Sequence, residues 1–140
     1  ANRNLREYLA FLGLDPGHPL APNADNPVFF TNAVMGLKNG AMSSNFSDRW
    51  LEESRNEFLG PLLDIIEPCV VITIGPKAIL TIGRLYGFPV GPHGAMVSAS
   101  PIRTVAGPLV FPVYHTGGLG LANRPKTQQI EDWLRIKAFL

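Results

Sequence analysis

Residues that could bind or react gather at three places, each close to the end of an apolar run. They are Asn32, the turn Gly75-Pro76-Lys77 and the segment from His115 to Gly120. The amide of Asn32 carries a donor and an acceptor in one plane, so it can pair with a base edge that has a carbonyl beside an N–H. A histidine at a strand end can donate to a carbonyl oxygen that gains negative charge. Backbone amides at a helix start, such as Gly75 to Lys77, can hold a phosphate.

Each feature also has a purely structural interpretation. An asparagine in a strand can be a satisfied core polar group, and a histidine before glycines can be an ordinary loop residue. Gly75-Pro76 is a common sequence at the start of a helix, whatever the function. Cys69, inside an apolar run, is expected to be a small buried hydrophobic residue. Gly117-Gly118-Leu119-Gly120 could cradle a phosphate, but its spacing fits no dinucleotide motif, and no serine-hydrolase, zinc-protease or Walker pattern is present.

The hydrophobic pattern predicts alternating helices and strands that would place these residues. A layered α/β domain with a mainly parallel sheet follows from that alternation, and ligands of such sheets collect at the carboxyl ends of the strands. Helices are expected over Leu5–Leu14, from Ser47 onward with a break at Gly60-Pro61, from Pro76 to Gly87, and from about Thr127 to Ala138; strands over Pro27–Val34, Cys69–Ile74, Pro101–Val105 and Leu109–Tyr114; and loops over Asp15–Pro27 and Phe88–Ser100. Pro112 indicates an edge strand or a bulge.

Length and composition set the class of the protein. The chain has 140 residues, 46% of them hydrophobic and 16% charged, which predicts one globular domain over residues 1–140. A formal net charge of +1 neither requires nor excludes a nucleic-acid partner, because local phosphate contacts decide such binding. One cysteine and three histidines predict no metal site. The absence of a long apolar run or signal peptide leads us to expect a cytoplasmic protein without membrane contact.

Three stretches, taken in order, resemble one known family. Phe29-Phe30-Thr31-Asn32-Ala33-Val34 is similar to a strand pattern Y-I-T-N-x-V, and Phe58 to Gly75 is similar to a helix followed by P-x-V-V-V-x-L-G. Phe111-Pro112-Val113-Tyr114-His115 is similar to a closing strand that ends in H-P-S. Over about residues 5 to 138 the chain therefore resembles the uracil-DNA glycosylase superfamily, nearest to its iron–sulfur branch.

The chain also departs from that family. Met35-Gly36 and about Arg55 stand where the iron–sulfur branch has cluster cysteines, so no cluster and no other cofactor is expected. The H-P-S motif is replaced by His115-Thr116-Gly117. In the family a strand and a carboxylate-bearing loop precede the first helix, whereas this chain starts at that helix. We therefore expect a glycosylase-like domain without its first strand and loop. Asp15-Pro16-Gly17 has residue types similar to that loop but follows the first helix instead of preceding it.

The resemblance implies a three-layer αβα fold and a monomer that flips uracil out of DNA and hydrolyses its N-glycosidic bond. It implies that His115 is catalytic and that Asn32 reads the base. Phosphate contacts are expected from Gly75, Lys77, Gly117, Gly118 and Arg124, with Leu119 or Leu121 as a wedge. Two alternatives stay open: a catalytically silent nucleic-acid-binding relative, and an α/β domain that binds a small ligand.

Overall fold

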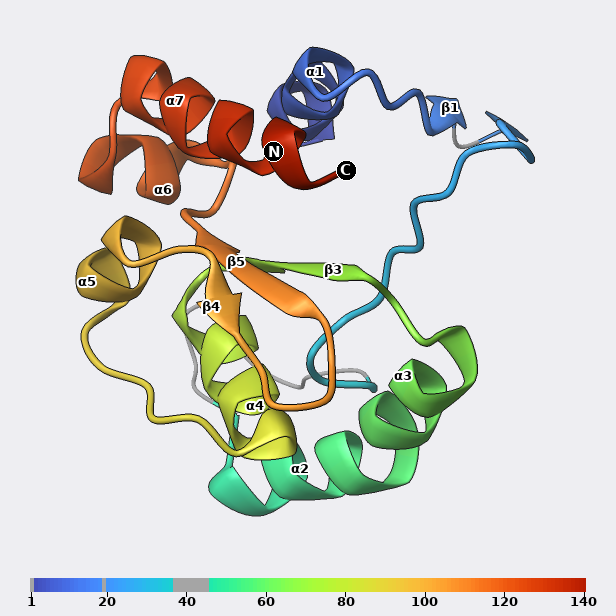
Figure 1. Ribbon diagram of the computed structural model, residues 1–140, viewed down its shortest axis with the longest axis vertical. Helices are drawn as coiled ribbons and strands as arrows, with labels where there is room; N and C mark the ends of the chain where they lie inside the picture. The colour runs from blue at the N-terminus through green and yellow to red at the C-terminus, as the bar shows by residue number, and fades with distance from the viewer. Residues whose placement is uncertain (1, 19, 37–45) are drawn as a thin grey trace.

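A computed structural model describes residues 2–18, 20–36 and 46–140 (Figure 1). The chain is a mixed α/β protein, as the alternating pattern predicts. Its elements are α1 (Asn2–Phe11), β1 (Gly17–His18), β2 (Ala21–Pro22), α2 (Asp48–Ser54), the π-helical turn η1 (Arg55–Leu59), α3 (Gly60–Ile66), β3 (Val70–Ile74), α4 (Pro76–Tyr86), α5 (His93–Ser98), β4 (Ile102–Arg103), β5 (Leu109–Val113), α6 (Gly118–Asn123), α7 (Lys126–Ile136) and the 3₁₀ turn η2 (Lys137–Phe139).

Within the described residues, the main sheet has three strands in the order β3-β5-β4. β3 and β5 are parallel, with Val70 opposite Leu109 and Ile74 opposite Val113, so the two strands begin together and end together. The short β4 is antiparallel to β5 and pairs only with its first two residues. β1 and β2 form a separate antiparallel hairpin within the predicted loop.

The two faces of the sheet pack against different helices (Figure 1). Side chains alternate between faces along a strand, so neighbouring residues of β5 enter different clusters. Phe111 and Val113 pack with buried side chains of α1 and α7, namely Tyr8, Leu9, Trp133 and Ile136. Val110 packs on the other side with Leu59 of η1 and with Ile79 and Ile82 of α4. The strands that carry the expected site are thus held from both sides.

The residues predicted to start or end helices at Ser47, Pro76 and Gly87 do so in the structure. Ser47 caps α2, because its side-chain oxygen accepts a hydrogen bond from the Trp50 N–H at 3.2 Å. At Gly60-Pro61 the expected break is not formed: the backbone stays helical from Asp48 to Ile66, and a π-helical turn, in which the Gly60 N–H bonds to the Arg55 carbonyl, takes its place. Pro76 opens α4, and Gly87 ends it with a φ of 73°. The helix starts at Ser47 and Pro76 and the stop at Gly87 are confirmed.

The strand expected over Pro27–Val34 is not formed. The segment is irregular, and Phe29 and Phe30 are 60% and 52% exposed. Its ends are anchored separately: Val28 packs against the α1–α7 cluster, and the Met35 N–H donates to Ser54 Oγ at 3.3 Å. Its β-branched and aromatic residues favour extended backbone, but a strand also needs a pairing neighbour, and no described strand pairs with this segment.

Three further expectations are corrected. Cys69 is exposed, since β3 begins one residue later and its chain enters from the surface. The stretch expected as a loop over Phe88–Ser100 contains α5, and α6 follows His115 where no helix is expected; each is six residues long, which is too short for a clear helical pattern. Pro112 lies on the central strand rather than at an edge. Along β5 the backbone nitrogens point alternately toward β3 and toward β4. The Leu109 N–H donates to the Cys69 carbonyl on the β3 side, so the backbone nitrogen of Pro112 points to the β4 side, beyond the end of β4. Proline, which has no N–H, is therefore tolerated there.

No helix among residues 2–18, 20–36 and 46–140 is long and apolar enough to cross a membrane.

We predict that Gly83→Ala destabilises the protein although alanine favours helices. A Cβ at Gly83 would collide with Val90 Cγ2 and come within 3.1 Å of the Phe88 carbonyl oxygen, so α4 would have to move off its neighbours. Overpacking of this kind costs about 1 to 3 kcal/mol. Urea unfolding followed by circular dichroism measures it. Gly91→Ala, whose Cβ has no neighbour within 4 Å, is the control and should leave stability nearly unchanged.

Candidate functional site

The carboxyl ends of β3 and β5 form one edge. The Gly75 N–H, directly after β3, donates to the Val113 carbonyl at the end of β5 over 2.9 Å. His115 follows Val113 by two residues, so the parallel register brings it to the end of the sheet at which α4 starts. In Figure 1, α4 and the chain that leads to α6 both leave from this end. The sheet therefore joins two of the three predicted features.

Gly75 has a structural reason to be glycine, because its φ is 88°, a conformation that other residues rarely adopt. Its N–H is used by Val113, so this donor is already engaged rather than open to a phosphate. Lys77, the second residue of α4, is exposed and forms none of the ion pairs among the described residues. Of the two residues predicted to contact phosphate at this turn, Lys77 is the one with a free charge.

His115 is exposed, and its ring is fixed by its own loop. The Gly117 N–H donates to His115 Nδ1 at 3.1 Å. A neutral imidazole whose Nδ1 accepts a hydrogen bond carries its proton on Nε2. Nε2 has no partner among the described residues, so the ring presents an N–H donor to solvent at the edge of the sheet. A donor at Nε2 is what the sequence-based hypothesis requires.

The helix after His115 lies directly against the His115 backbone. A Cβ at Gly120 would overlap the His115 carbonyl oxygen, so only glycine fits there. Gly118 is different, because a Cβ there meets nothing within 4 Å. Leu119, between them, is 81% exposed and points away from the core at the start of α6. The glycines of this segment thus serve close packing at Gly120, while Gly118 and Leu119 face solvent.

Two amide side chains hold the same segment from neighbouring helices. Asn4 of α1 donates from Nδ2 to the Thr116 carbonyl at 2.8 Å. Gln129 of α7, buried in the core, donates from Nε2 to the Arg124 carbonyl at 3.1 Å and to the His115 carbonyl at 3.4 Å. One side chain therefore bonds residues on both sides of α6, which fixes the position of His115 relative to Leu119.

Arg124 does not present a free guanidinium. Its Nε and Nη2 donate to the two carboxylate oxygens of Asp132 at 2.5 and 2.8 Å, and its Nη1 donates to Gln128 Oε1 at 3.1 Å. The hydrogen bond with Asp132 raises the pKa of Arg124. The Asp132 side chain is only 2% exposed and also bonds Arg135. Arg124, predicted to contact phosphate, is engaged in joining α6 to α7.

Asn32 lies outside the sheet. It is exposed in the irregular segment between β2 and α2, and no hydrogen bond or ion pair among the described residues joins it to His115 or Gly75. In Figure 1 the described part of this segment passes from the upper right to the region below the sheet. Its amide makes no hydrogen bond within the described chain.

Sequence reasoning missed His93, which opens α5 and reaches the same edge. Its ring packs edge-on against Tyr114, with ring centroids 4.8 Å apart. His93 Nε2 is buried and has no partner in the described structure. Burial lowers the pKa of His93, and the backbone of Val113 offsets only part of that effect. The signal was Pro92, which marks a helix start inside a stretch expected as a loop.

No group of three or more His, Cys, Asp or Glu side chains in the described ranges is arranged to hold a metal ion. The arrangement at this edge is a fixed imidazole donor beside an exposed leucine and a lysine. Such groups can bind an anion or a carbonyl oxygen by hydrogen bonding.

We predict that Gly120→Ala detaches α6 and destabilises the protein by about 1 to 3 kcal/mol or more, because the new Cβ overlaps the His115 carbonyl. Gly118→Ala is the matched control and should change stability by less than about 0.5 kcal/mol. Urea unfolding gives both values. Equal stability of the two variants would show that α6 does not rest on His115 in this way.

We also predict that stability falls as the pH drops below 6.5, the ordinary pKa of histidine. The folded protein has a lowered His93 pKa, so between that pKa and 6.5 the unfolded chain binds more protons and acid favours unfolding. The contribution of neutral His93 is complete above 6.5. In His93→Gln the unfolding free energies at pH 7.5 and pH 5.5 should be closer to each other than in the parent. The control His18→Gln should keep the parent's loss of stability at pH 5.5. An unchanged pH dependence in His93→Gln contradicts this assignment.

Comparison with known proteins assigns no family to the chain. A scan against protein-family models found no match, and a search of curated proteins found none either.

Proposed function

We propose that this protein is a uracil-DNA glycosylase-like domain that takes a flipped uracil at the carboxyl edge of its sheet. In this proposal the helices on the two faces of the sheet correspond to the three-layer αβα architecture of that superfamily. The motif order and the position of His115 after β5 support it. The reaction is hydrolysis of the N-glycosidic bond, for which the base must first leave the duplex stack.

The observation that carries the proposal is the fixed Nε2–H of His115. As the glycosidic bond breaks, negative charge collects on the uracil ring and its carbonyl oxygens. A donor held in place before the reaction stabilises that charge without having to reorient, and one such donor is worth roughly 3 kcal/mol in comparable sites. The bond from the Gly117 N–H to Nδ1 and the clamps from Asn4 and Gln129 supply that positioning.

Contacts with DNA would come from the residues around His115. Leu119 is 81% exposed on a helix that is fastened to the His115 backbone, which suits a side chain that enters the space left by a flipped base. Lys77 offers a free charge for a phosphate, and Gly117 and Gly118 allow close approach of a backbone. Arg124 acts in this proposal by holding α6 against α7. Asn32 has an unbonded amide, and we propose that it pairs with the uracil edge in the DNA complex.

A catalytically silent DNA-binding relative is the second candidate. The carboxylate joined to α6, that of Asp132, bonds Arg124 and Arg135 and is almost completely buried. A carboxylate held in this way cannot position an attacking water. Binding of DNA without release of uracil would be the behaviour of this second candidate.

We predict that His115→Ala lowers the single-turnover rate of uracil release about 100-fold while DNA affinity changes little, because its donor acts once charge has developed. His18→Ala is the matched control: His18 is also exposed, and its Nδ1 also accepts a backbone N–H two residues later, from Leu20. Leu119→Ala should weaken binding to uracil-containing duplex, with the exposed Leu20→Ala as its control.

Asn32→Ala should lower both the rate and the preference for uracil, since the base edge in the DNA complex would be left without its hydrogen-bonding partner, at a cost of about 1 to 3 kcal/mol. If His115→Ala releases uracil as fast as the parent, His115 is not in the site and the glycosylase proposal fails. If the parent binds DNA and releases no base, the silent relative is the better account.

A further inference from the structure

A groove lies at the opposite end of the sheet, where β3 and β5 begin. A hollow of about 210 Å³ between α3 and the end of α4 adjoins a larger one of about 640 Å³, and Leu63, Asp64 and Tyr86 line both. The larger hollow extends to Cys69 and Pro108, the residues directly before the two strands. Its volume is in the range of small-molecule sites. None of the residues assigned above to the proposed DNA site lines it.

The charged groups of the groove are acidic. Asp64 lies on α3, and Glu67 follows the end of that helix. The ion pairs in the described ranges use other carboxylates, so neither Asp64 nor Glu67 has a cationic partner there. No lysine or arginine is among the residues that line either hollow. The charged side chains that line the groove are thus acidic only.

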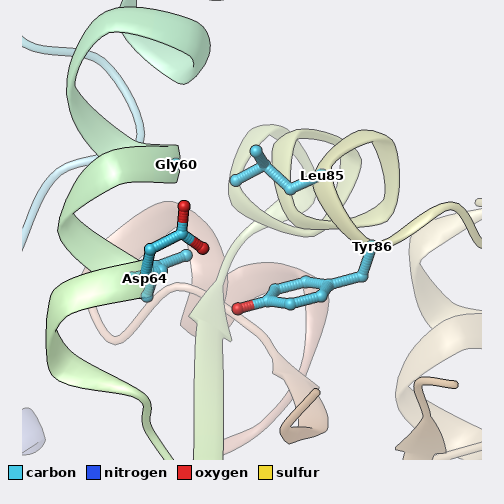
Figure 2. Close-up of a pocket in the computed structure, with 5 residues that line it drawn as sticks. Gly60, Asp64, Leu85 and Tyr86 are labelled. Atoms are coloured by element: carbon cyan, nitrogen blue, oxygen red, sulfur yellow. The ribbon is translucent and has the colours of Figure 1, made fainter. Parts of the chain in front are cut away.

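Tyr86 forms the wall opposite Asp64. Figure 2 shows the Asp64 carboxylate on α3 and the Tyr86 ring at the end of α4 facing the same space. Gly107 holds the ring in place, since a Cβ there would come within 2.7 Å of Tyr86 Cε1. Burial first, and then the charge of Asp64, raise the pKa of Tyr86, so the phenol stays neutral. A neutral ring face attracts cations, and its hydroxyl can accept a hydrogen bond from an ammonium group.

We propose that this groove binds an aliphatic ammonium group, as carried by a diamine or by a lysine side chain. The ammonium contacts Asp64 and Glu67, and the methylene chain lies against Leu63 and the Tyr86 ring. Two carboxylates close in sequence favour a ligand with more than one positive charge. The inference does not depend on the DNA site, because the groove begins at the other end of the strands.

Putrescine is the first probe, titrated by calorimetry against the whole chain, with 1,4-butanediol as its uncharged analogue. We expect saturable binding of putrescine that weakens with added salt, and none of butanediol. Asp64→Asn and Glu67→Gln should each weaken binding about two- to fivefold, in line with exposed ion pairs, and the double variant should lose it. Glu57→Gln, an acidic residue outside the groove, is the matched control and should bind as the parent does.

Cys69 provides a second readout, because it is exposed, lines the groove and is the single cysteine of the chain. Putrescine should slow its alkylation by iodoacetamide in the parent and not in the double variant. N-acetyl-lysine amide distinguishes a lysine side chain of a partner from a free polyamine as the natural ligand. Protection of Cys69 equal to that by putrescine indicates the lysine side chain, and weaker protection indicates the polyamine. Absence of saturable putrescine binding in the folded parent, or equal binding by the double variant, overturns the proposal.

Discussion

The carbonyl of Val113 is the point at which the candidate site is assembled. It accepts the Gly75 N–H at 2.9 Å, which joins the end of β3 to the end of β5. Because β3 and β5 are parallel and in register, whatever follows each strand must leave from the same edge. The start of α4 and His115 therefore meet there, although they are far apart in the sequence. The start of α5 reaches the same edge through His93, whose ring packs against Tyr114.

The buried carboxylate of Asp132 has a different role, which is to fix α6 against α7. Removing such a charge from water costs several kcal/mol, and that cost is offset only when hydrogen bonds satisfy both oxygens. Arg124 and Arg135 do this, and the Arg124 guanidinium also lies 5.8 Å from the centre of the Tyr114 ring. Because the cost of burial offsets much of the attraction, these ion pairs contribute more to the position of α6 than to net stability. Loss of one partner would still leave an unpaired charge in the core. A residue that looked like a phosphate ligand is thus part of the support for His115.

The sheet also separates two chemically different ends. At the carboxyl edge the exposed groups are a histidine donor, a lysine and a leucine, whereas the groove at the amino ends carries Asp64 and Glu67. A polyanion would be attracted to the first end and repelled by the second, and the reverse holds for an ammonium ligand. The two proposals can therefore be tested independently on one chain.

The sequence by itself determined what depends on near neighbours. Ser47, Pro76 and Gly87 set helix ends through caps and backbone limits that act within a few residues, and the apolar runs of β3 and β5 predicted a strand pair with His115 just beyond it. Only the tertiary structure decided the partners. Pro27–Val34 has the composition of a strand but pairs with no described strand, and Arg124 has the type of a phosphate ligand but a buried carboxylate within reach. Strand pairing depends on residues distant in sequence, and the burial of Asp132 depends on how α7 packs, so no local pattern records either.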